Sequence, residues 1–200
     1  MYAGLAGFFN AMLIGRAVPL ASAGSEWTRF PIISLLTGNL AERMDRSALF
    51  LDRDGVINVD RGYIHRSDQF EFIPGIFELA RFWTNELRRP IVVVANQSGI
   101  GRGYFSEYRR DHPWRKPKPG MILQAVLDLG LDPARCAILG DKISHMEAGA
   151  EAGIGLRVLI GPHDAKPNET IHEVVADLDE ALALFRARFV RHVKALQHPT

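Results

Sequence analysis

A chain of 200 residues is long enough for one domain with a sizeable hydrophobic core, and its 47% hydrophobic and 24% charged residues are typical of a folded globular protein. Its 24 Lys and Arg residues nearly balance 23 Asp and Glu residues, so no global field attracts nucleic acid or an anionic membrane surface. The single cysteine, Cys136, excludes an internal disulfide and a multi-cysteine zinc site, and it fits a reducing cytoplasm.

Residues 1–46 are expected to form a poorly defined N-terminal extension, with helical pieces around Leu5–Ile14 and Ile32–Met44. The run Ala21-Ser22-Ala23 resembles a signal-peptidase site, but no Lys or Arg precedes the apolar stretch as an export signal requires. No apolar run reaches the length needed to span a bilayer. We therefore expect a cytoplasmic protein without a membrane partner, folded as one domain over residues 47–200.

A buried strand is predicted at Leu49–Leu51, and two carboxylates, Asp52 and Asp54, follow it at once. Residues two apart in an extended chain point the same way, so both carboxylates can face one site. Two acids this close repel each other unless a cation or a shared proton intervenes. The pattern therefore indicates a hard cation such as Mg²⁺ and phosphate chemistry, although two solvated acids at a strand end are the alternative.

Helix and strand patterns alternate after this point. Apolar residues at helical spacing predict an amphipathic helix over Pro74–Arg88, and the β-branched run Ile91–Ala95 predicts a strand covered on both faces. Further elements are predicted in chain order: a helix over Met121–Leu129, a strand over Cys136–Leu139, a helix over Met146–Gly153, a strand over Leu156–Ile160, an edge piece at Val174–Val175 and a closing helix from near Asp177. This order predicts an α/β fold, a doubly wound three-layer domain around a parallel sheet.

Polar segments follow the ends of these strands. The loop Asn96–Gly103 is rich in glycine and in amide and hydroxyl donors, which could hold an oxyanion or could belong to an ordinary loop. The segment Trp114–Gly120 packs three cations between prolines just before a helix, where an anion could bind, although most charge runs are solvated. Asp141 arrives at the carboxyl end of a strand, where ligands gather in open α/β sheets.

Four segments stand in the order used by phosphatases of the haloacid dehalogenase (HAD) superfamily, and the chain resembles that family. They are Asp52-Arg53-Asp54-Gly55, Asn96-Gln97-Ser98-Gly99, Arg115-Lys116-Pro117 and Gly140-Asp141-Lys142. Within the superfamily, the runs DRDGVIN, NQSGIGRG and RKPKPGM make residues 48–160 similar to the branch of D-glycero-D-manno-heptose 1,7-bisphosphate 7-phosphatases and histidinol-phosphatases. The resemblance implies a HAD-like Rossmannoid fold with a minimal cap or none.

The resemblance also implies a phosphatase that hydrolyses a phosphomonoester of a small metabolite, such as a phosphorylated sugar, with Mg²⁺ as cofactor. Asp52 would attack phosphorus to form an aspartyl-phosphate, and Asp54 would protonate the leaving oxygen and then activate water. Lys116 would stabilise the transferring phosphoryl group. Mg²⁺ would be held by Asp52, the backbone carbonyl of Asp54, and Asp141. The implied substrate-binding positions are Asp60, Arg61, Gly62, Tyr63, Asn96, Gln97, Ser98, Arg115 and Lys142.

Three departures from the family pattern bear on activity. Ala95 stands where members usually carry a Thr or Ser that binds phosphate, and losing one transition-state donor can cost about 10²- to 10³-fold in rate. Residues 104–114 replace a longer segment that carries a cysteine/histidine zinc loop in that branch, so no zinc is expected. His145 stands where an additional acid often follows, and a partly exposed surface histidine is the simpler interpretation.

These departures leave a second function open, a pseudo-phosphatase that acts as a binding protein or is a degenerate gene product. A phosphotransferase, which passes the phosphoryl group to an acceptor other than water, is a third. Hydrolysis requires that Asp52, Asp141 and Lys116 lie close enough to share one phosphate and its ion. The expected partner is a small phosphorylated metabolite rather than nucleic acid.

Overall fold

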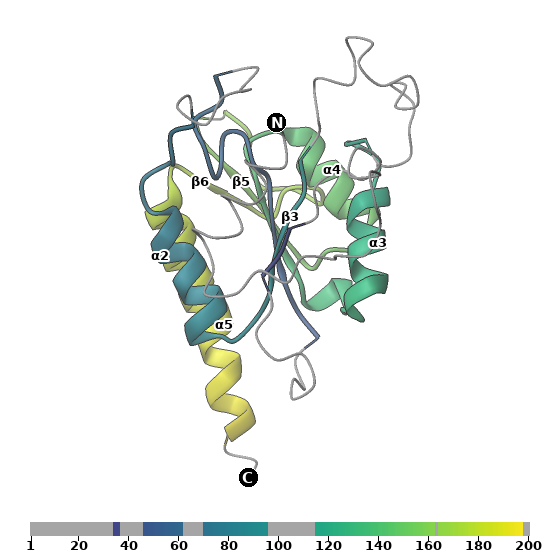
Figure 1. The fold of residues 1–200 in the computed structure, drawn as a ribbon, viewed down its shortest axis with the longest axis vertical. Helices are drawn as coiled ribbons and strands as arrows, with labels where there is room; N and C mark the ends of the chain where they lie inside the picture. The colour runs from purple at the N-terminus through teal and green to yellow at the C-terminus, as the bar shows by residue number, and fades with distance from the viewer. Residues whose placement is uncertain (1–33, 37–45, 62–69, 96–114, 163, 198–200) are drawn as a thin grey trace, which may run out of the picture.

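A six-stranded sheet forms the centre of the computed structural model, which describes residues 34–36, 46–61, 70–95, 115–162 and 164–197 (Figure 1). The strands, in chain order, are β1 (Ser34–Leu36), β2 (Leu49–Leu51), β3 (Ile91–Val93), β4 (Ala137–Gly140), β5 (Leu156–Ile160) and β6 (Glu173–Val175). The helices are α2 (Ile76–Arg81), the π-helix η3 (Phe82–Glu86), α3 (Gly120–Leu129), the 3₁₀ helix η5 (Pro133–Arg135), α4 (Ile143–Glu151) and α5 (Leu178–Gln197).

The strands are arranged in the order β1-β3-β2-β4-β5-β6. Five neighbouring strands are parallel, as predicted: β3, β2, β4, β5 and β6. The edge strand β1 pairs with β3 in the antiparallel direction. The predicted helical piece over Ile32–Met44 is therefore wrong at residues 34–36, which form an edge strand. A short apolar run has no periodicity that distinguishes a helix from a strand. Pairing with β3 therefore determines the conformation of residues 34–36.

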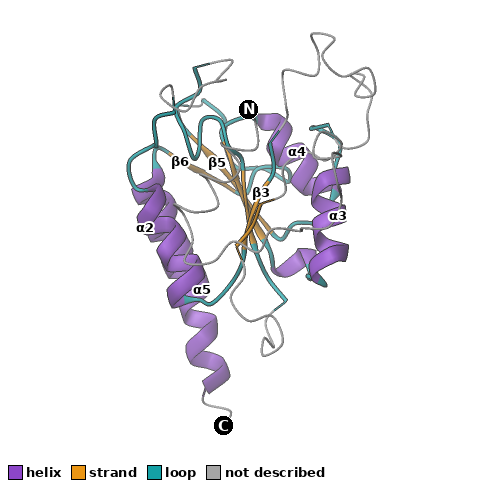
Figure 2. Cartoon of the chain, viewed as in Figure 1, coloured by secondary structure: helices purple, strands orange, loops and turns teal. Residues whose placement is uncertain are grey.

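Helices cover both faces of the sheet, which confirms the predicted three-layer architecture (Figure 2). Leu49 and Leu51 pack in a core cluster with residues of α2, η3 and α5, and Phe50 packs in a second cluster with residues of α3 and α4. This alternation follows from the two-residue period of an extended strand. All three side chains are buried, so β2 is the central strand of the core.

The helix predicted over Pro74–Arg88 is shorter and changes its winding. After α2, the chain continues as η3, in which the backbone amide of Leu87 donates to the carbonyl of Phe82 at 2.9 Å. The wider π turn accompanies the complete burial of two adjacent aromatic residues, Phe82 and Trp83. The helix predicted from Met121 to Leu129 is confirmed as α3, and Gly130 ends it with a φ of 60°. None of the helices in the described ranges combines the length and the apolar character needed to cross a membrane.

Candidate active site

The candidate site lies where three neighbouring parallel strands end. In the ladder, Leu51 of β2 is paired with Val93 of β3 on one side and with Leu139 of β4 on the other. The next residues along each strand therefore emerge at one edge of the sheet, and Asp52 is the residue that follows β2. The backbone amide of Asp52 donates to the carbonyl of Leu139 at 3.2 Å, which fixes the start of its loop against β4.

A buried ion pair joins Asp52 to Lys116. Lys116 Nζ donates to Asp52 Oδ1 at 2.5 Å and to the carbonyl oxygen of Val94 at 2.8 Å. The side chains of Lys116 and Asp52 are only 2% and 7% exposed, so water screens this contact little. Burial raises the pKa of Asp52 and lowers the pKa of Lys116 from their usual values, and the attraction between the two charges opposes both shifts.

Local backbone geometry directs Lys116 toward this pair. The backbone amide of Lys118 donates to the carbonyl of Arg115 at 2.9 Å, which closes a tight turn immediately before α3. The turn contains Pro117, and Pro119 follows it as the N-cap of α3. The lysine expected to stabilise a phosphoryl group therefore enters the site from the start of a helix, 64 residues along the chain from Asp52.

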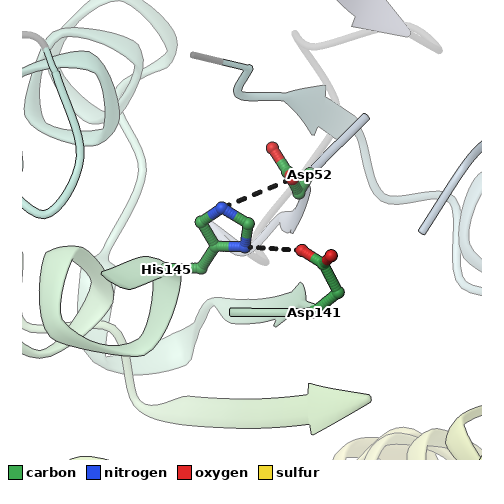
Figure 3. A group of neighbouring side chains, drawn as sticks. All are labelled: Asp52, Asp141 and His145. Atoms are coloured by element: carbon green, nitrogen blue, oxygen red, sulfur yellow. Dashed lines mark ion pairs between the residues drawn. The ribbon is translucent and has the colours of Figure 1, made fainter. Parts of the chain in front are cut away.

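His145 lies between the two acids of the site, and the expectation of a partly exposed surface histidine is wrong (Figure 3). Its Nε2 is 3.3 Å from Asp52 Oδ2, and its Nδ1 is 3.5 Å from Asp141 Oδ1. His145 belongs to the first turn of α4, and Asp141 follows β4, so a four-residue spacing returns the ring to the strand end. A histidine four residues after a strand-end acid, at the start of the helix that follows the strand, is the sequence pattern that could have predicted a histidine at this site.

The charge state of His145 and Asp141 depends on their burial. Burial, followed by the nearby charges of Lys116 and Lys142, lowers the pKa of His145 to about 2, so its imidazole is neutral at physiological pH. Burial raises the pKa of Asp141, and the positive charge of Lys142 opposes this shift. Burial alone would lower the pKa of Lys142, but its hydrogen bond to Asp60 and the charge of Asp141 raise it above its usual value.

The donor atoms present at the strand ends fit a divalent cation. Asp52, Asp141 and His145 each offer one ligand atom, and these atoms lie within 4.8 Å of one another. Asp141 Oδ1 and His145 Nδ1 are buried without a hydrogen-bond partner in the described residues. The surrounding backbone is close: a Cβ at Gly55 would lie 2.2 Å from Asp141 Oδ2, and one at Gly140 would lie 2.4 Å from His145 Nδ1.

Asp54 lies in the turn after β2, and neighbouring side chains hold its carboxylate. Arg53 donates from Nε to Asp54 Oδ1 at 3.0 Å and from Nη2 to Asp54 Oδ2 at 2.7 Å. Asn58, which is fully buried, donates from Nδ2 to Asp54 Oδ1 at 3.0 Å. Gly55 gives the turn its positive φ of 84°, a conformation that glycine adopts without steric cost. Asp54 is thus oriented by its own turn, within two residues of Asp52.

The expected substrate-binding residues do not all lie at the strand ends. Lys142 Nζ is 3.0 Å from Asp60 Oδ2 and 3.6 Å from Asp141 Oδ2, so Asp60 and Lys142 border the strand ends. Arg61 instead pairs with Glu71 on the exposed surface. Arg115 takes part in the turn that precedes α3. The remaining expected positions lie outside the described residues: Gly62, Tyr63, Asn96, Gln97 and Ser98.

Comparison with known proteins assigns the fold and the family. Residues 113–181 match the family model described as HAD-hydrolase-like. A D-glycero-β-D-manno-heptose-1,7-bisphosphate 7-phosphatase of Haemophilus influenzae is 36% identical over 169 residues, which cover 65% of this chain and 89% of the relative. The corresponding α-anomer phosphatase of Burkholderia mallei is 39% identical over 159 residues, which cover 61% of this chain and 84% of the relative.

Solved structures give the same result. A Mesorhizobium loti protein described as a HAD-like phosphatase is 31% identical, with a TM-score of 0.65, over 80% of this chain and 95% of that one. The D,D-heptose 1,7-bisphosphate phosphatase of B. bronchiseptica, solved with magnesium and phosphate, shares the fold at 22% identity, with a TM-score of 0.59, over 71% of this chain and 99% of that one. With the sheet order, the strand-end carboxylates and these relatives in agreement, the chain belongs to the HAD superfamily of phosphatases.

Proposed function

We propose that this HAD phosphatase hydrolyses a phosphomonoester of a small phosphorylated sugar, such as D-glycero-D-manno-heptose 1,7-bisphosphate, with a divalent cation, Mg²⁺, as cofactor. The observation that carries the proposal is the buried contact between Asp52 and Lys116, with a second carboxylate, Asp141, at the adjacent strand end. The names of the relatives support a phosphorylated sugar as the substrate and do not favour the pseudo-phosphatase.

Asp52 is the proposed nucleophile. A carboxylate oxygen of Asp52 forms a bond to phosphorus while the bond from phosphorus to the leaving sugar oxygen breaks, which gives an aspartyl-phosphate. Lys116 already donates to this carboxylate, and the same ammonium group can stabilise the phosphoryl oxygens as negative charge shifts onto them. The low exposure of both side chains strengthens this electrostatic contribution, because little water competes with it.

Asp54 is the proposed acid and base. It gives a proton to the leaving oxygen in the first step. In the second step it takes a proton from the water that attacks phosphorus, while the bond from phosphorus to the Asp52 oxygen breaks, which releases inorganic phosphate and regenerates the Asp52 carboxylate. Arg53 and Asn58 hold the Asp54 carboxylate through three hydrogen bonds. The leaving oxygen must therefore come within hydrogen-bonding distance of this fixed carboxylate. A bound cation, held by Asp52, Asp141 and the carbonyl of Asp54, would neutralise charge on the phosphate and on Asp52.

We further propose that the substrate lies over the strand ends, beside the pair Asp60 and Lys142. The Lys142 ammonium is held at 3.0 Å from Asp60 and about half exposed, so it can contact a second anionic or hydroxyl group of the substrate. A bisphosphorylated sugar offers such a group at a distance from the reacting phosphate. Arg61, paired with Glu71, would have to leave that ion pair to contribute.

The test is phosphate release by the 200-residue protein from a panel of metabolites that includes heptose 1,7-bisphosphate and histidinol phosphate. We expect release with Mg²⁺, none with a chelator, and none from the Asp52→Asn variant under either condition. Asp128→Asn is the matched control, because Asp128 is an exposed carboxylate on α3 that accepts a hydrogen bond from Gln124. It should keep the wild-type rate.

Three results would contradict the proposal. Equal rates for the wild type and Asp52→Asn would show that a different group attacks phosphorus. Absence of release over the whole panel, from a protein that is folded by circular dichroism, would favour the pseudo-phosphatase. Transfer of phosphate to an added sugar without release of inorganic phosphate would identify a phosphotransferase.

A further inference from the structure

The candidate cation site contains an imidazole between its two carboxylates (Figure 3). His145 Nε2 lies 3.3 Å from Asp52 Oδ2, and His145 Nδ1 lies 3.5 Å from Asp141 Oδ1. Two donors that bind one ion at about 2.1 Å each can be at most ~4.2 Å apart, and the 3.5 Å between His145 Nδ1 and Asp141 Oδ1 suits such a pair. A histidine binds one ion through a single ring nitrogen, and one ligand atom from each of Asp52, Asp141 and His145 lies within 4.8 Å of the other two. The ring is therefore within coordinating distance of the position expected for the metal, and does not merely border it.

A second observation also points to a ligand at this position. His145 Nδ1 and Asp141 Oδ1 are buried and face each other, and neither has a hydrogen-bond partner among the described residues. Buried polar atoms without partners are costly, and a cation bound to both would satisfy both at once. The ring is confined, because a Cβ at Gly140 would lie only 2.4 Å from Nδ1, and the next residue, Met146, is fully buried in the core.

The chemistry of a nitrogen ligand differs from that of a third oxygen. Mg²⁺ binds oxygen ligands and keeps several waters, whereas imidazole nitrogen is a preferred ligand for Zn²⁺, Co²⁺ and related ions. We propose that Asp52, Asp141 and His145 together bind a borderline transition-metal ion of the Co²⁺ or Zn²⁺ class more tightly than Mg²⁺, by a margin that depends on the His145 nitrogen. The inference rests on the proposed function for the location of the site, and it concerns which ion the site selects.

Metal binding to the metal-free, 200-residue protein, measured by titration calorimetry with Co²⁺ and with Mg²⁺ separately, tests the proposal. We expect the ratio of the two affinities to fall by about tenfold or more in His145→Asp, because an oxygen replaces the nitrogen ligand. His145→Asn, which brings no extra buried charge, should reduce the ratio in the same direction. His172→Gln is the matched control, because His172 contacts Arg157 and belongs to no part of the site.

Two further measurements make the outcome decisive. Asp141→Asn should weaken Co²⁺ and Mg²⁺ binding together, which identifies the titrated site as this one. Pulsed electron paramagnetic resonance of the wild type with one equivalent of Mn²⁺ should detect a bound nitrogen, and that signal should be absent in His145→Asp. An affinity ratio that stays within about twofold of the wild type in both folded His145 variants would overturn the proposal, as would a wild-type site that binds Mg²⁺ more tightly than Co²⁺.

Failure of this inference is distinguishable from failure of the proposed function, because no substrate is present in these titrations. A protein that selects Co²⁺ through His145 but releases phosphate from no substrate would retain the inference and lose the function. A protein that hydrolyses a sugar phosphate, but whose metal selectivity is unchanged in the His145 variants, would retain the function and lose the inference.

Discussion

The pair of Asp52 and Lys116 connects stability to catalysis at the scale of single residues. Lys116 supplies a positive charge to a carboxylate that is 7% exposed, and its second hydrogen bond goes to the carbonyl of Val94. Removing one member of a buried ion pair leaves the other charge without compensation, which costs more than the intact pair contributes. The same contact that positions the proposed nucleophile therefore also determines how much the fold tolerates a change at this position.

Lys116→Met should lower the free energy of unfolding by about 3 kcal/mol at neutral pH, because Asp52 would stay buried without its cation. Urea unfolding followed by circular dichroism measures this loss. The double variant Asp52→Asn, Lys116→Met removes both charges and should recover part of the stability while remaining inactive. A double variant that is less stable than Lys116→Met would argue against a charge imbalance as the cause.

Ala95 is a buried residue one position beyond the Val94 carbonyl that accepts from Lys116, at a position where the resemblance to HAD phosphatases implies a hydroxyl. Ala95→Thr should raise the rate of phosphate release, by up to about 10²-fold if no other donor fills the role. Ala95→Val has nearly the same shape without the hydroxyl, so it should give no gain. Equal rates for the two variants, measured as kcat with a saturating sugar phosphate, would mean that another group already binds that oxygen.

At the scale of elements, the turn after β2 and the end of α3 both depend on a glycine with positive φ. Gly55 has a φ of 84° and Gly130 a φ of 60°, so an alanine at either position adopts an unfavourable backbone conformation. Their surroundings differ, because a Cβ at Gly55 would lie 2.2 Å from Asp141 Oδ2, whereas a Cβ at Gly130 would meet nothing within 4 Å. Alanine at Gly130 therefore tests the backbone strain alone, whereas alanine at Gly55 tests the same strain together with a steric clash against Asp141.

Gly130→Ala should cost about 1 kcal/mol of stability and leave phosphate release unchanged. Gly55→Ala carries a similar backbone strain, and it should also displace Asp141 and weaken both metal binding and turnover. Thermal unfolding, metal titration and a phosphate-release assay on the two variants distinguish these effects. Wild-type metal affinity in Gly55→Ala would show that metal binding does not depend on the present position of Asp141.

At the scale of the whole molecule, the face of the sheet that carries α2, η3 and α5 stabilises the domain without forming the site. Phe185 of α5 is fully buried, and its ring packs edge-on against Trp83 of η3 with centroids 5.5 Å apart. This contact joins residues that are far apart in the sequence. It holds the closing helix against the sheet, while the residues of the site come from the strand ends, the turn before α3, and α4.

Phe185→Ala should lower the free energy of unfolding by about 3 to 5 kcal/mol through loss of a fully buried ring, with little effect on KM at temperatures where the protein is folded. Leu127→Ala is the comparison, because Leu127 on α3 is 76% exposed and its truncation should change stability by less than about 0.5 kcal/mol. Denaturant unfolding measures both. A similar loss for the two variants would contradict the assignment of Phe185 to the core.

Sequence patterns alone predicted most of the parallel sheet and the position of its acids. Leu49–Leu51 and Leu156–Ile160 are apolar runs of strand length, and their bounds match β2 and β5. Asp52 and Asp141 follow strands, and parallel strands end at a shared edge, so their proximity follows from topology. The winding of η3 and the strand at residues 34–36 could not be predicted, because burial of Phe82 beside Trp83 and pairing with β3 are long-range effects.

The amino-acid sequence by itself determined the α/β class, the central strand and the order of the family segments, since these depend on local periodicity and on residues close in the chain. Only the tertiary structure decided that Lys116 pairs with Asp52 and that His145 is buried between Asp52 and Asp141. The physical reason is that burial and ion pairing arise between elements, when three strand ends, a turn and the first turn of a helix exclude water from one small volume.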